Sequence, residues 1–584
     1  MRMKNKPAAL KGHGYSYDEF DNNKILDGKK KNHLPAMGWN SWNAFGSGNT
    51  EELTKQMADR MIELGLDKLG YKYVVLDDGC YMSERVNDRL SAEPVKFKNG
   101  FKALADYLHN KGLKFGMYND IGTNLCAGAA VGTFAHEALD AASYAEWGID
   151  FIKVDNCYYM WDDATFADEK NIKYTYTPII KKVELRAQDF TVYECSFDDE
   201  KGLGTKDGTA PLHSPVGVLC DEKEIDLSNI NAGAYELIIG CEHKEAAETG
   251  KWIQVAVGRG ESSRLIFDDF AVDDNNTVSQ FELKLQLELK ADDDVIRIMN
   301  HRRQENTLDS YSTFLEELNK AKPGHDIIYS ICEWGKTQPH RWAYKVGDSW
   351  RILNDITFNV GSDGDPGKAN WEDEYTTSVC SQYNKCVIMD EFAGLSKGWN
   401  DPDMLVVGMD GLSNVQYRTH MVMWCMMNSP LMLGMDLRRV NKGDAIYEII
   451  ADEDLIALNQ DALGIQAKRA KIVSRDHTYT QPDKEYVRDN DRVDILVKPL
   501  SDASVAVSFI NLSSQDMTGE ISISFDEIQD TLSRQNQTIQ FAGDSSSYVS
   551  YNLADKSSTP VTYKKITINR LAAYDNYTVK LKRI

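Results

Sequence analysis

The chain has 584 residues, of which 42% are hydrophobic and 10% aromatic, and its formal net charge is -24. A chain of this length is expected to form about two to four domains, and its composition excludes a largely disordered protein. The acidic balance excludes nucleic acid and anionic membranes as partners, because both are bound by basic surfaces, and we expect a neutral or weakly charged substrate.

The termini and cysteines carry few localisation signals. The first twenty residues contain basic side chains but no apolar run as long as a signal peptide. The nearest candidate for a membrane helix, 421–435, is interrupted by Asn428, Ser429 and Pro430. We therefore expect a cytoplasmic protein, or a secreted one if a signal was removed from the chain.

The ten cysteines are too sparse for a disulfide scaffold and show no CxxC metal spacing. The oligomeric state stays open, and a homo-oligomer is compatible with the sequence.

Short apolar runs alternate with helical patterns over the first 470 residues, which is typical of a βα repeat. The runs expected to form strands are 35–45, 71–80, 113–122, 149–157, 325–335, 349–355, 398–405 and 430–437. Eight is the number of strands in a TIM barrel, whose active sites lie at the carboxyl ends of the strands. The sequence therefore predicts an α/β protein built on a TIM (β/α)8 barrel.

One interval between predicted strands, 158–324, is much longer than a βα crossover requires. Its alternating apolar and polar residues predict antiparallel strands joined by polar turns. We expect an inserted antiparallel β-sandwich at 166–304, between a first barrel half at 1–165 and a second at 305–470. The alternation returns at 471–584, where it predicts a C-terminal antiparallel β-domain.

Two carboxylates at strand ends indicate the chemistry. Asp155 lies at the end of the fourth run, two residues after Lys153, and Asp355 ends the sixth run, four residues after Arg351. Most aspartates that follow strands form turns or cap helices. Two carboxylates on different strand ends of a barrel nevertheless suggest glycoside hydrolysis. In that reaction one carboxylate attacks the sugar or activates water, and the other protonates the leaving oxygen.

Seven motifs along the chain resemble those of glycoside hydrolase family 27, the α-galactosidases and α-N-acetylgalactosaminidases. They stand in the family's order and read MGWNSWNAF, VLDDG, FGMYNDIGTNLCAG, KVDNC, SICEWG, SWRILND and GWNDPDML. The resemblance covers about 33–165 and 305–584, and it implies a TIM barrel followed by an antiparallel β-domain. The inserted segment resembles a galactose-binding carbohydrate-binding module, but much more weakly.

The resemblance implies a retaining exo-glycosidase that releases terminal α-linked D-galactose without a cofactor. Asp155 is then the nucleophile, and Asp355 is the general acid that becomes the general base. The residues that match sugar-binding positions of the family are Trp42, Asp77, Asp78, Tyr118, Lys153, Glu333, Arg351, Asp403 and Met404. The family often joins the cysteines that match Cys126 and Cys157 in a disulfide, and the sequence leaves both states of this pair open.

Three positions bear on specificity by this resemblance. Asp77 and Asp78 match the pair that binds the galactose hydroxyls at C4 and C6. Glu333 matches the residue that accompanies a free 2-hydroxyl. The two aspartates also suit a divalent metal, but neither a histidine nor a further acidic ligand stands at metal spacing nearby, so we expect no metal. After the CEW motif the chain has Lys336 and Thr337 where an aromatic is common, which leaves the aglycone open.

Other readings remain at this point. The same fold also serves α-N-acetylgalactosaminidases, in which a small residue replaces the glutamate, and β-L-arabinopyranosidases, which lose the first carboxylate of the DDG pair. A non-catalytic sugar-binding protein, with the inserted segment as its working part, is the remote alternative. The presence of both Asp155 and Asp355 speaks against it, since a binding protein needs neither.

Overall fold

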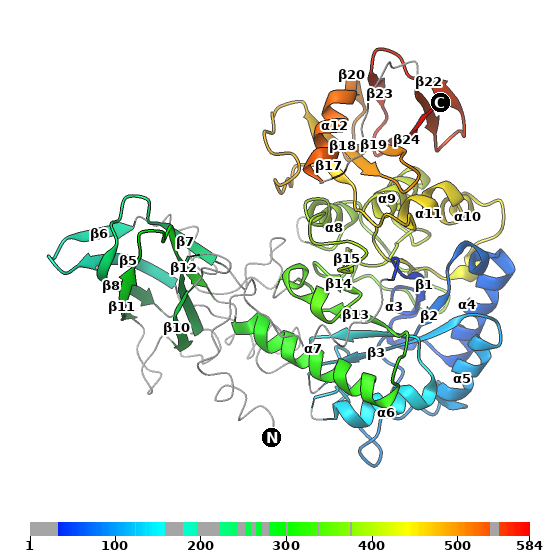
Figure 1. Ribbon diagram of the computed structural model, residues 1–584. Helices are drawn as coiled ribbons and strands as arrows, with labels where there is room; N and C mark the ends of the chain where they lie inside the picture. Colours follow the sequence, from blue (N-terminus) through cyan, green and yellow to red (C-terminus); the bar gives the residue numbers. More distant parts are fainter. Residues whose placement is uncertain are drawn as a thin grey trace.

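The computed structural model describes residues 33–122, 124–134, 136–157, 179–195, 222–242, 252–258, 264–270, 280–299, 302–335, 338–373, 376–535, 537 and 548–584. The described chain forms a parallel sheet, two antiparallel sheets inserted into it, and antiparallel sheets at its C-terminal end (Figure 1). No helix among these residues is long and apolar enough to cross a membrane.

The parallel sheet has eight strands in the order β15-β14-β13-β4-β3-β2-β1-β16. They are β1 (Met37–Asn40), β2 (Tyr73–Val75), β3 (Lys114–Asp120), β4 (Phe151–Asp155), β13 (Ile328–Cys332), β14 (Ser349–Arg351), β15 (Trp399–Asp401) and β16 (Leu431–Leu433). Leu405, which follows β15, forms a parallel bridge with Leu433 of β16 and so brings the two edges of the sheet together. Each of the eight predicted runs contains one of these strands, and the TIM-barrel prediction is confirmed.

These strands are short and apolar because the sheet is covered on both faces. The inner face contributes Tyr73, Val75, Phe151, Ile328 and Met432 to one apolar cluster. The outer face packs against helices and joins the large core of the barrel. Polar residues such as Asp120 and Asp155 stand at the carboxyl ends of these strands, where the site lies.

Helices surround the barrel. They are α3 (Trp42–Phe45), α4 (Glu51–Leu64), α5 (Gly100–His109), α6 (Glu137–Trp147), α7 (Arg302–Ala321), α8 (Val379–Cys386), α9 (Asn414–Met426), α10 (Ala445–Ile450) and α11 (Glu453–Asn459). Helix α4 shows how the sequence sets their limits. The Thr50 side chain accepts a hydrogen bond from the Leu53 N–H, and Gly65 ends the helix with a left-handed φ of 76°.

Short 3-10 turns complete the barrel. They are η1 (Gly46–Gly48), η2 (Leu66–Leu69), η7 (Pro339–Arg341), η8 (Ala343–Lys345) and η9 (Leu437–Arg439). Between β13 and β14, the turns η7 and η8 stand where a βα repeat would place an α-helix.

The insertion between β4 and α7 contains two four-stranded antiparallel sheets, with the orders β10-β9-β12-β7 and β11-β8-β5-β6. Their strands are β5 (Ile179–Ala187), β6 (Val192–Cys195), β7 (Glu222–Asp226), β8 (Gly233–Glu242), β9 (Trp252–Val257), β10 (Arg264–Phe270), β11 (Gln280–Leu289) and β12 (Val295–Met299). Alternate residues such as Leu237 and Ile239 of β8 are buried in a common apolar core. The two sheets thus form the sandwich that the alternation predicts.

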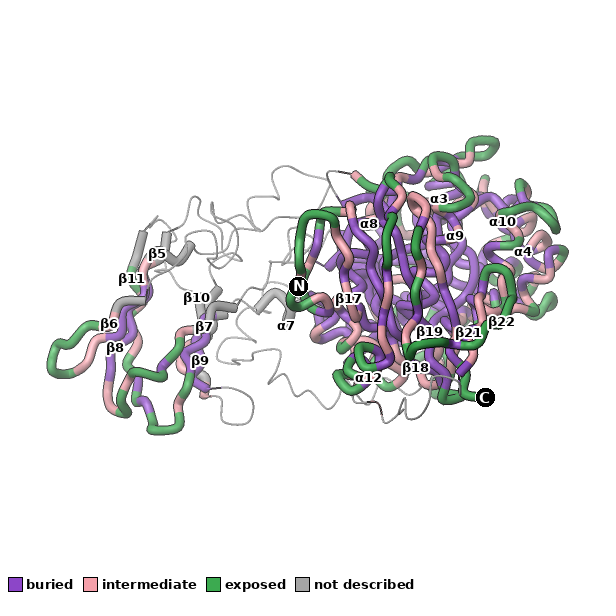
Figure 2. Tube along the Cα trace, turned by 90° about the horizontal axis from the view of Figure 1, so that it is seen from above, coloured by how far each residue is buried: buried purple, intermediate pink, exposed green. Residues whose placement is uncertain are grey.

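The C-terminal part is antiparallel, as predicted. A six-stranded sheet, β17-β18-β19-β24-β21-β22, lies beside the pair β20-β23. The elements are β17 (Lys468–Ser474), β18 (Arg492–Pro499), β19 (Val505–Asn511), β20 (Met517–Ser524), α12 (Phe525–Arg534), β21 (Tyr548–Asn552), β22 (Ser558–Pro560), β23 (Lys565–Leu571) and β24 (Asn576–Arg583). Tyr383 of α8 donates a hydrogen bond to Asp494 of β18 (3.0 Å), which ties this part to the barrel. Figure 2 shows these strands largely buried, as in β18 and β19.

Candidate active site

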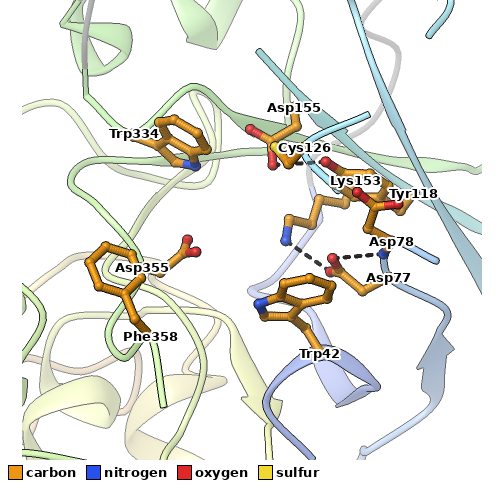
Figure 3. A pocket seen from close by; sticks show the side chains of 10 residues that line it. All are labelled: Trp42, Asp77, Asp78, Tyr118, Cys126, Lys153, Asp155, Trp334, Asp355 and Phe358. Carbon is orange, nitrogen blue, oxygen red and sulfur yellow. Dashed lines mark hydrogen bonds and ion pairs between the residues drawn. The ribbon is translucent and has the colours of Figure 1, made fainter. Parts of the chain in front are cut away.

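A pocket of about 360 Å³ opens at the carboxyl ends of the barrel strands (Figure 3). Its lining consists of Trp42, Asp77, Asp78, Tyr118, Cys126, Lys153, Asp155, Trp334, Asp355 and Phe358. A TIM barrel places its active site at this end, because the loops that follow the strands are free to carry functional side chains. Both strand-end carboxylates singled out from the sequence therefore share one cavity.

Asp155 is the last residue of β4 and is almost fully buried. Its Oδ1 accepts a hydrogen bond from the Asn156 N–H (2.9 Å), and its Oδ2 accepts one from the Tyr118 hydroxyl (3.3 Å). Two donors fix the orientation of the carboxylate and stabilise its charged form. This arrangement suits a nucleophile, which has to be ionised and correctly aimed before the substrate arrives.

Lys153 lies two residues before Asp155, on the same face of β4. Its Nζ makes an ion pair with Asp77 Oδ2 (2.8 Å) and lies 5.3 Å from the centre of the Tyr118 ring. Burial lowers the pKa of Lys153, but Asp77 and its acidic neighbours raise it more, and the net pKa is well above the usual value. The side chain is therefore a fixed cation, and its direct partner is Asp77 rather than the expected nucleophile.

Asp77 and Asp78 follow β2 and form the wall that lies across the cavity from Asp355. Asp77 Oδ2 also accepts a hydrogen bond from Asn40 Nδ2 (2.8 Å), while its Oδ1 accepts the Asp78 N–H (2.9 Å). Asp78 accepts the N–H groups of Gly79 (2.6 Å) and Ala127 (2.7 Å). Burial raises the pKa of Asp78 to about 6 even though these N–H groups oppose the rise. The pair is a rigid acceptor surface suited to sugar hydroxyls.

Trp42 begins α3 and is held by the same network, since its N–H donates to Asn40 Oδ1 (2.8 Å). The residue lines the pocket beside Asp77, and its ring faces the cavity in Figure 3. An indole face in such a position can stack on the apolar face of a sugar. Asn40 was not among the predicted site residues, although it belongs to the GWNSWN motif that supplied Trp42.

Asp355 lies across the cavity from Asp77 and Asp78, and its position is fixed by buried residues outside the pocket. Arg351 donates to Asp355 Oδ1 (3.0 Å) and pairs with Asp403 Oδ2 (3.1 Å). Burial raises the pKa of the Asp355 carboxyl, Arg351 opposes the rise, and Asp403 adds to it, with a net upward result. An upward shift of this kind favours a general acid, because the carboxyl group has to carry the proton that it gives to the leaving oxygen.

Asp403 supports Asp355 rather than lining the cavity. Its backbone has a left-handed φ of 75°, which is rare for a residue other than glycine. Its Oδ2 accepts the Ile356 N–H (2.8 Å) and its Oδ1 accepts the Met404 N–H (2.8 Å). The first bond holds the backbone that follows Asp355, and the second holds the backbone that follows Asp403, so both carboxylate oxygens of Asp403 have protein partners.

The structure separates the predicted residues into two groups. Those that line the pocket are Trp42, Asp77, Asp78, Tyr118, Lys153, Asp155 and Asp355, together with Cys126. Those that do not are Glu333, Arg351, Asp403 and Met404. Glu333 directly follows β13 and is fully buried, so its expected contact with the sugar's 2-hydroxyl stays a prediction.

Two lining residues were missed from the sequence. Trp334 follows Glu333 in the SICEWG motif, and Phe358 stands three residues after Asp355. Proximity to a predicted site residue was the only signal available for either side chain. The aromatic wall that they form is part of the same cavity.

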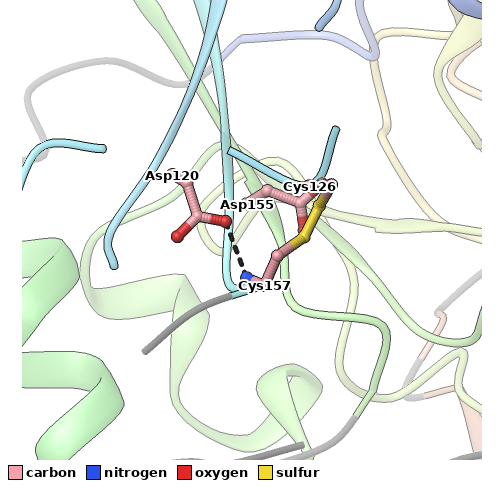
Figure 4. A group of neighbouring side chains, drawn as sticks. All are labelled: Asp120, Cys126, Asp155 and Cys157. Carbon is pink, nitrogen blue, oxygen red and sulfur yellow. Dashed lines mark hydrogen bonds between the residues drawn. A yellow bond between two sulfur atoms is a disulfide. The ribbon is translucent and has the colours of Figure 1, made fainter. Parts of the chain in front are cut away.

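The disulfide between Cys126 and Cys157 connects the loop after β3 to the end of β4 (Figure 4). Asp120 stands beside it and accepts the N–H groups of Cys157 (2.6 Å) and Gly122 (2.6 Å). These side chains and Asp155 are close enough to suggest a metal site. Disulfide sulfurs are not thiolate ligands, however, and the Asp120 oxygens already accept backbone N–H groups, so the donor set does not fit a metal ion.

Comparison with known proteins finds similarity to alpha-galactosidases. The sequence model of the family described as Alpha galactosidase A matches residues 34–206 and 274–461. The chain is 28% identical to Alpha-galactosidase A of Cellvibrio japonicus (strain Ueda107) over 506 residues, which are 86% of this chain and 81% of that protein. It is 26% identical to an Alpha-galactosidase of Cyamopsis tetragonoloba over 486 residues, 83% of this chain and 74% of that protein.

Solved structures show the same fold. The alignment with alpha-galactosidase I from Mortierella vinacea has a TM-score of 0.58 and 23% identity, and covers 94% of this chain and 97% of that one. An alpha-galactosidase from Saccharomyces cerevisiae gives a TM-score of 0.58 at 20% identity, with coverage of 98% and 100%. Residues 207–273 lie outside the two segments that the family model matches.

Proposed function

We infer that this chain, which belongs to the Alpha galactosidase A family, is an α-galactosidase: a glycoside hydrolase that releases terminal α-linked D-galactose. The observation that carries this function is the single pocket into which both Asp155 and Asp355 project, at barrel strand ends inside the matched segments. Lysine, tryptophan and paired aspartates around it supply the hydroxyl-binding and stacking groups that a sugar ring needs.

The proposed mechanism is a retaining double displacement. In the first step Asp155 attacks the anomeric carbon while Asp355 gives its proton to the glycosidic oxygen, and the leaving alcohol departs. In the second step Asp355 takes a proton from water, and that water attacks the anomeric carbon and displaces Asp155. Two inversions restore the original configuration. The upward shift of the Asp355 pKa supports its role as the acid, and the donors to Asp155 support its role as the nucleophile.

Specificity for galactose is proposed to come from the polar wall that lies across the cavity from Asp355. Asp77 and Asp78 accept hydrogen bonds from the sugar's hydroxyls at C4 and C6, Lys153 donates to the ring's oxygens, and Trp42 stacks on its apolar face. The carboxylate of Asp77 speaks against a pentose that lacks the C6 hydroxyl. An α-N-acetylgalactosaminidase or β-L-arabinopyranosidase on this fold remains the alternative that specificity tests have to separate.

The natural substrate is proposed to be an α-galactoside oligosaccharide, since a Saccharomyces cerevisiae alpha-galactosidase of the same fold is described with raffinose. A carbohydrate-binding role for the inserted sheets stays a prediction. On the outward face of β5, β8 and β11, the described side chains are largely charged and paired, such as Lys182 with Glu184 (2.8 Å) and with Glu282 (3.5 Å).

The test is hydrolysis of p-nitrophenyl α-D-galactopyranoside beside the α-N-acetylgalactosaminide and β-L-arabinopyranoside. We expect a strong preference for the galactoside. The first-formed sugar, followed by proton NMR before it mutarotates, should be α-galactose. Preference for another glycoside would overturn the specificity proposal, and β-galactose as the first product would overturn the double displacement.

A further inference from the structure

The disulfide between Cys126 and Cys157 lies beside the proposed nucleophile (Figure 4). Cys157 stands two residues beyond Asp155, and Cys126 lines the same pocket as Asp155. The ligand atoms of the two cysteines, Asp155 and Asp120 all lie within 4.8 Å of one another. Neither sulfur takes part in the proposed double displacement, so the position of the bond next to the attacking carboxylate calls for a separate explanation.

The disulfide can be reached from the pocket. Cys157 is buried, but Cys126 is partly exposed where it lines the cavity, and Ala127 and Gly128 beyond it are exposed. A reducing thiolate attacks one sulfur and forms a mixed disulfide, so it has to reach only one of the two. When a dithiol completes this exchange, its two hydrogens end on Cys126 and Cys157 as thiols, and its own sulfurs become joined to each other.

Both cysteines are also held in place by hydrogen bonds that do not involve sulfur. The Cys157 N–H donates to Asp120 (2.6 Å), and the Ala127 N–H, next to Cys126, donates to Asp78 (2.7 Å). Reduction of the disulfide removes neither bond. The two thiols should therefore stay side by side, with their Cα atoms near the present separation of 5.3 Å.

Reduction changes the donor set at this place. Disulfide sulfurs are poor ligands, whereas two thiolates are preferred by zinc-type ions, and a carboxylate oxygen can add to them. Two thiolates on a tetrahedral ion, each about 2.3 Å from it, lie about 3.8 Å apart, which cysteines at this Cα separation can reach.

Of the two neighbouring carboxylates, Asp155 is better suited as a third ligand. Its bond from the Tyr118 hydroxyl is long (3.3 Å) and comes from a side chain, which can turn away. Both oxygens of Asp120, in contrast, are held by backbone N–H groups at 2.6 Å. An ion between the two thiolates would therefore be bound by the carboxylate at the end of β4.

We propose that Cys126, Cys157 and Asp155 form a metal site that exists only when the disulfide is reduced, and that its ligand is a thiophilic divalent ion of the zinc type. One ion enters and the two thiol protons leave. The bound ion holds the carboxylate that has to attack the sugar, so the metal-loaded enzyme is inactive, and the disulfide protects the nucleophile from such ions. The inhibition rests on the proposed function, which makes Asp155 the nucleophile, whereas the binding of the ion does not.

Cadmium is the probe, because cadmium–thiolate bonds absorb in the ultraviolet and report binding without an enzyme assay. The protein is reduced with dithiothreitol, which is then removed without air, and the thiol count of a denatured sample should rise by two. Added Cd²⁺ should produce the absorbance band and abolish hydrolysis of the p-nitrophenyl galactoside in parallel, and a chelator should reverse both. The oxidised protein should show neither change at the same concentration of Cd²⁺.

Three variants control the experiment. Cys126→Ser keeps one thiolate and should bind Cd²⁺ more than about 100-fold more weakly, which exceeds the usual loss when only a hydrogen-bond partner of a ligand is changed. Cys157→Ser should behave in the same way, so the result does not depend on how well one variant folds. Cys380→Ala removes a free buried thiol on α8 and should respond to reduction and Cd²⁺ as the parent does.

Equal inhibition of the oxidised and reduced proteins, or undiminished binding in both serine variants, would overturn the proposed site. A band with undiminished hydrolysis would do the same, because the ion would then lie away from Asp155. A disulfide that resists dithiothreitol, or a reduced chain that loses its folded tryptophan fluorescence, would also overturn it, since the site needs a folded, reduced protein. A cadmium band in a chain that hydrolyses no α-galactoside would instead support the site and overturn the proposed function.

Discussion

Asp78→Asn tests the electrostatics of the pocket quantitatively. Burial raises the pKa of Asp78 from 3.8 to about 6, so the folded protein holds a proton that the unfolded chain has already lost. Between these two pH values the folded state binds more protons, and its stability falls as the pH rises. At 1.36 kcal/mol per pH unit, the loss is about 3 kcal/mol and is complete above pH 6.

Asparagine does not titrate, so the variant should lack this pH dependence. Its amide can replace one but not both oxygens that accept the N–H groups of Gly79 and Ala127, which adds a cost of about 1–3 kcal/mol at every pH. The difference in unfolding free energy between variant and parent should therefore move by about 3 kcal/mol in the variant's favour from pH 3.5 to pH 7.

The assay is urea denaturation followed by tryptophan fluorescence at several pH values, with KM for the p-nitrophenyl galactoside measured alongside. Asp526→Asn, which changes an exposed carboxylate on α12, is the control and should show no comparable trend. KM should rise in Asp78→Asn because a hydroxyl acceptor is lost. A stability difference that stays constant with pH would refute the reasoning about burial.

Three further outcomes are expected. Asp355→Asn should slow methyl α-galactoside hydrolysis far more than that of a dinitrophenyl galactoside, whose leaving group needs no proton; equal losses would contradict the acid assignment. Cys126→Ser should cost about 3–4 kcal/mol of stability, because the disulfide to Cys157 closes a loop with a sequence separation of 31. Denaturation with and without reductant checks this, since reductant should destabilise the parent but not the variant. Cys80→Ser changes a free buried thiol, so this control should still be destabilised by reductant. Burial lowers the pKa of His420 to about 3, so the folded state resists a proton that the unfolded chain accepts below about pH 6.5, and stability should fall as the pH drops through this window. His420→Gln should lose that part of the acid sensitivity, and an unchanged profile would contradict it.

The barrel and its two carboxylates were predictable for a physical reason. A parallel sheet covered on both faces has strands that are almost wholly apolar, so each strand appears as a short hydrophobic run. Functional carboxylates are therefore expected at or just beyond the end of such a run, and Asp155 and Asp355 lie there. The inserted and C-terminal sheets were recognisable because one-sided burial imposes alternation, as in Leu237 and Ile239.

Features that depend on contacts between distant segments were not predictable. Phe358 lies in an irregular loop with no periodicity, and only the anchoring of that loop to Lys368 brings its ring to the cavity. Nor did any sequence pattern indicate that Arg351 would also pair with Asp403 behind the pocket wall. Their roles follow from side-chain directions, which strand-end position alone does not determine.

The pairing of Cys126 with Cys157 is another such feature. It joins two loops that the barrel places side by side, and sequence spacing does not encode that proximity. The turns η7 and η8 likewise occupy a place where the repeat pattern called for a helix. Local composition there includes Pro339, which favours a turn or a helix start and restricts the residue before it.

The central claim is that Asp155 forms the bond to galactose, and nucleophile rescue tests it most directly. Asp155→Gly should be inactive on p-nitrophenyl α-D-galactopyranoside by several orders of magnitude, since the attacking group is gone. Added azide should enter the vacated space and restore release of nitrophenol, and the sugar product should be β-galactosyl azide, formed by a single inversion. Substantial activity without azide, or α-galactosyl azide as the product, would contradict the assignment of Asp155 as the nucleophile.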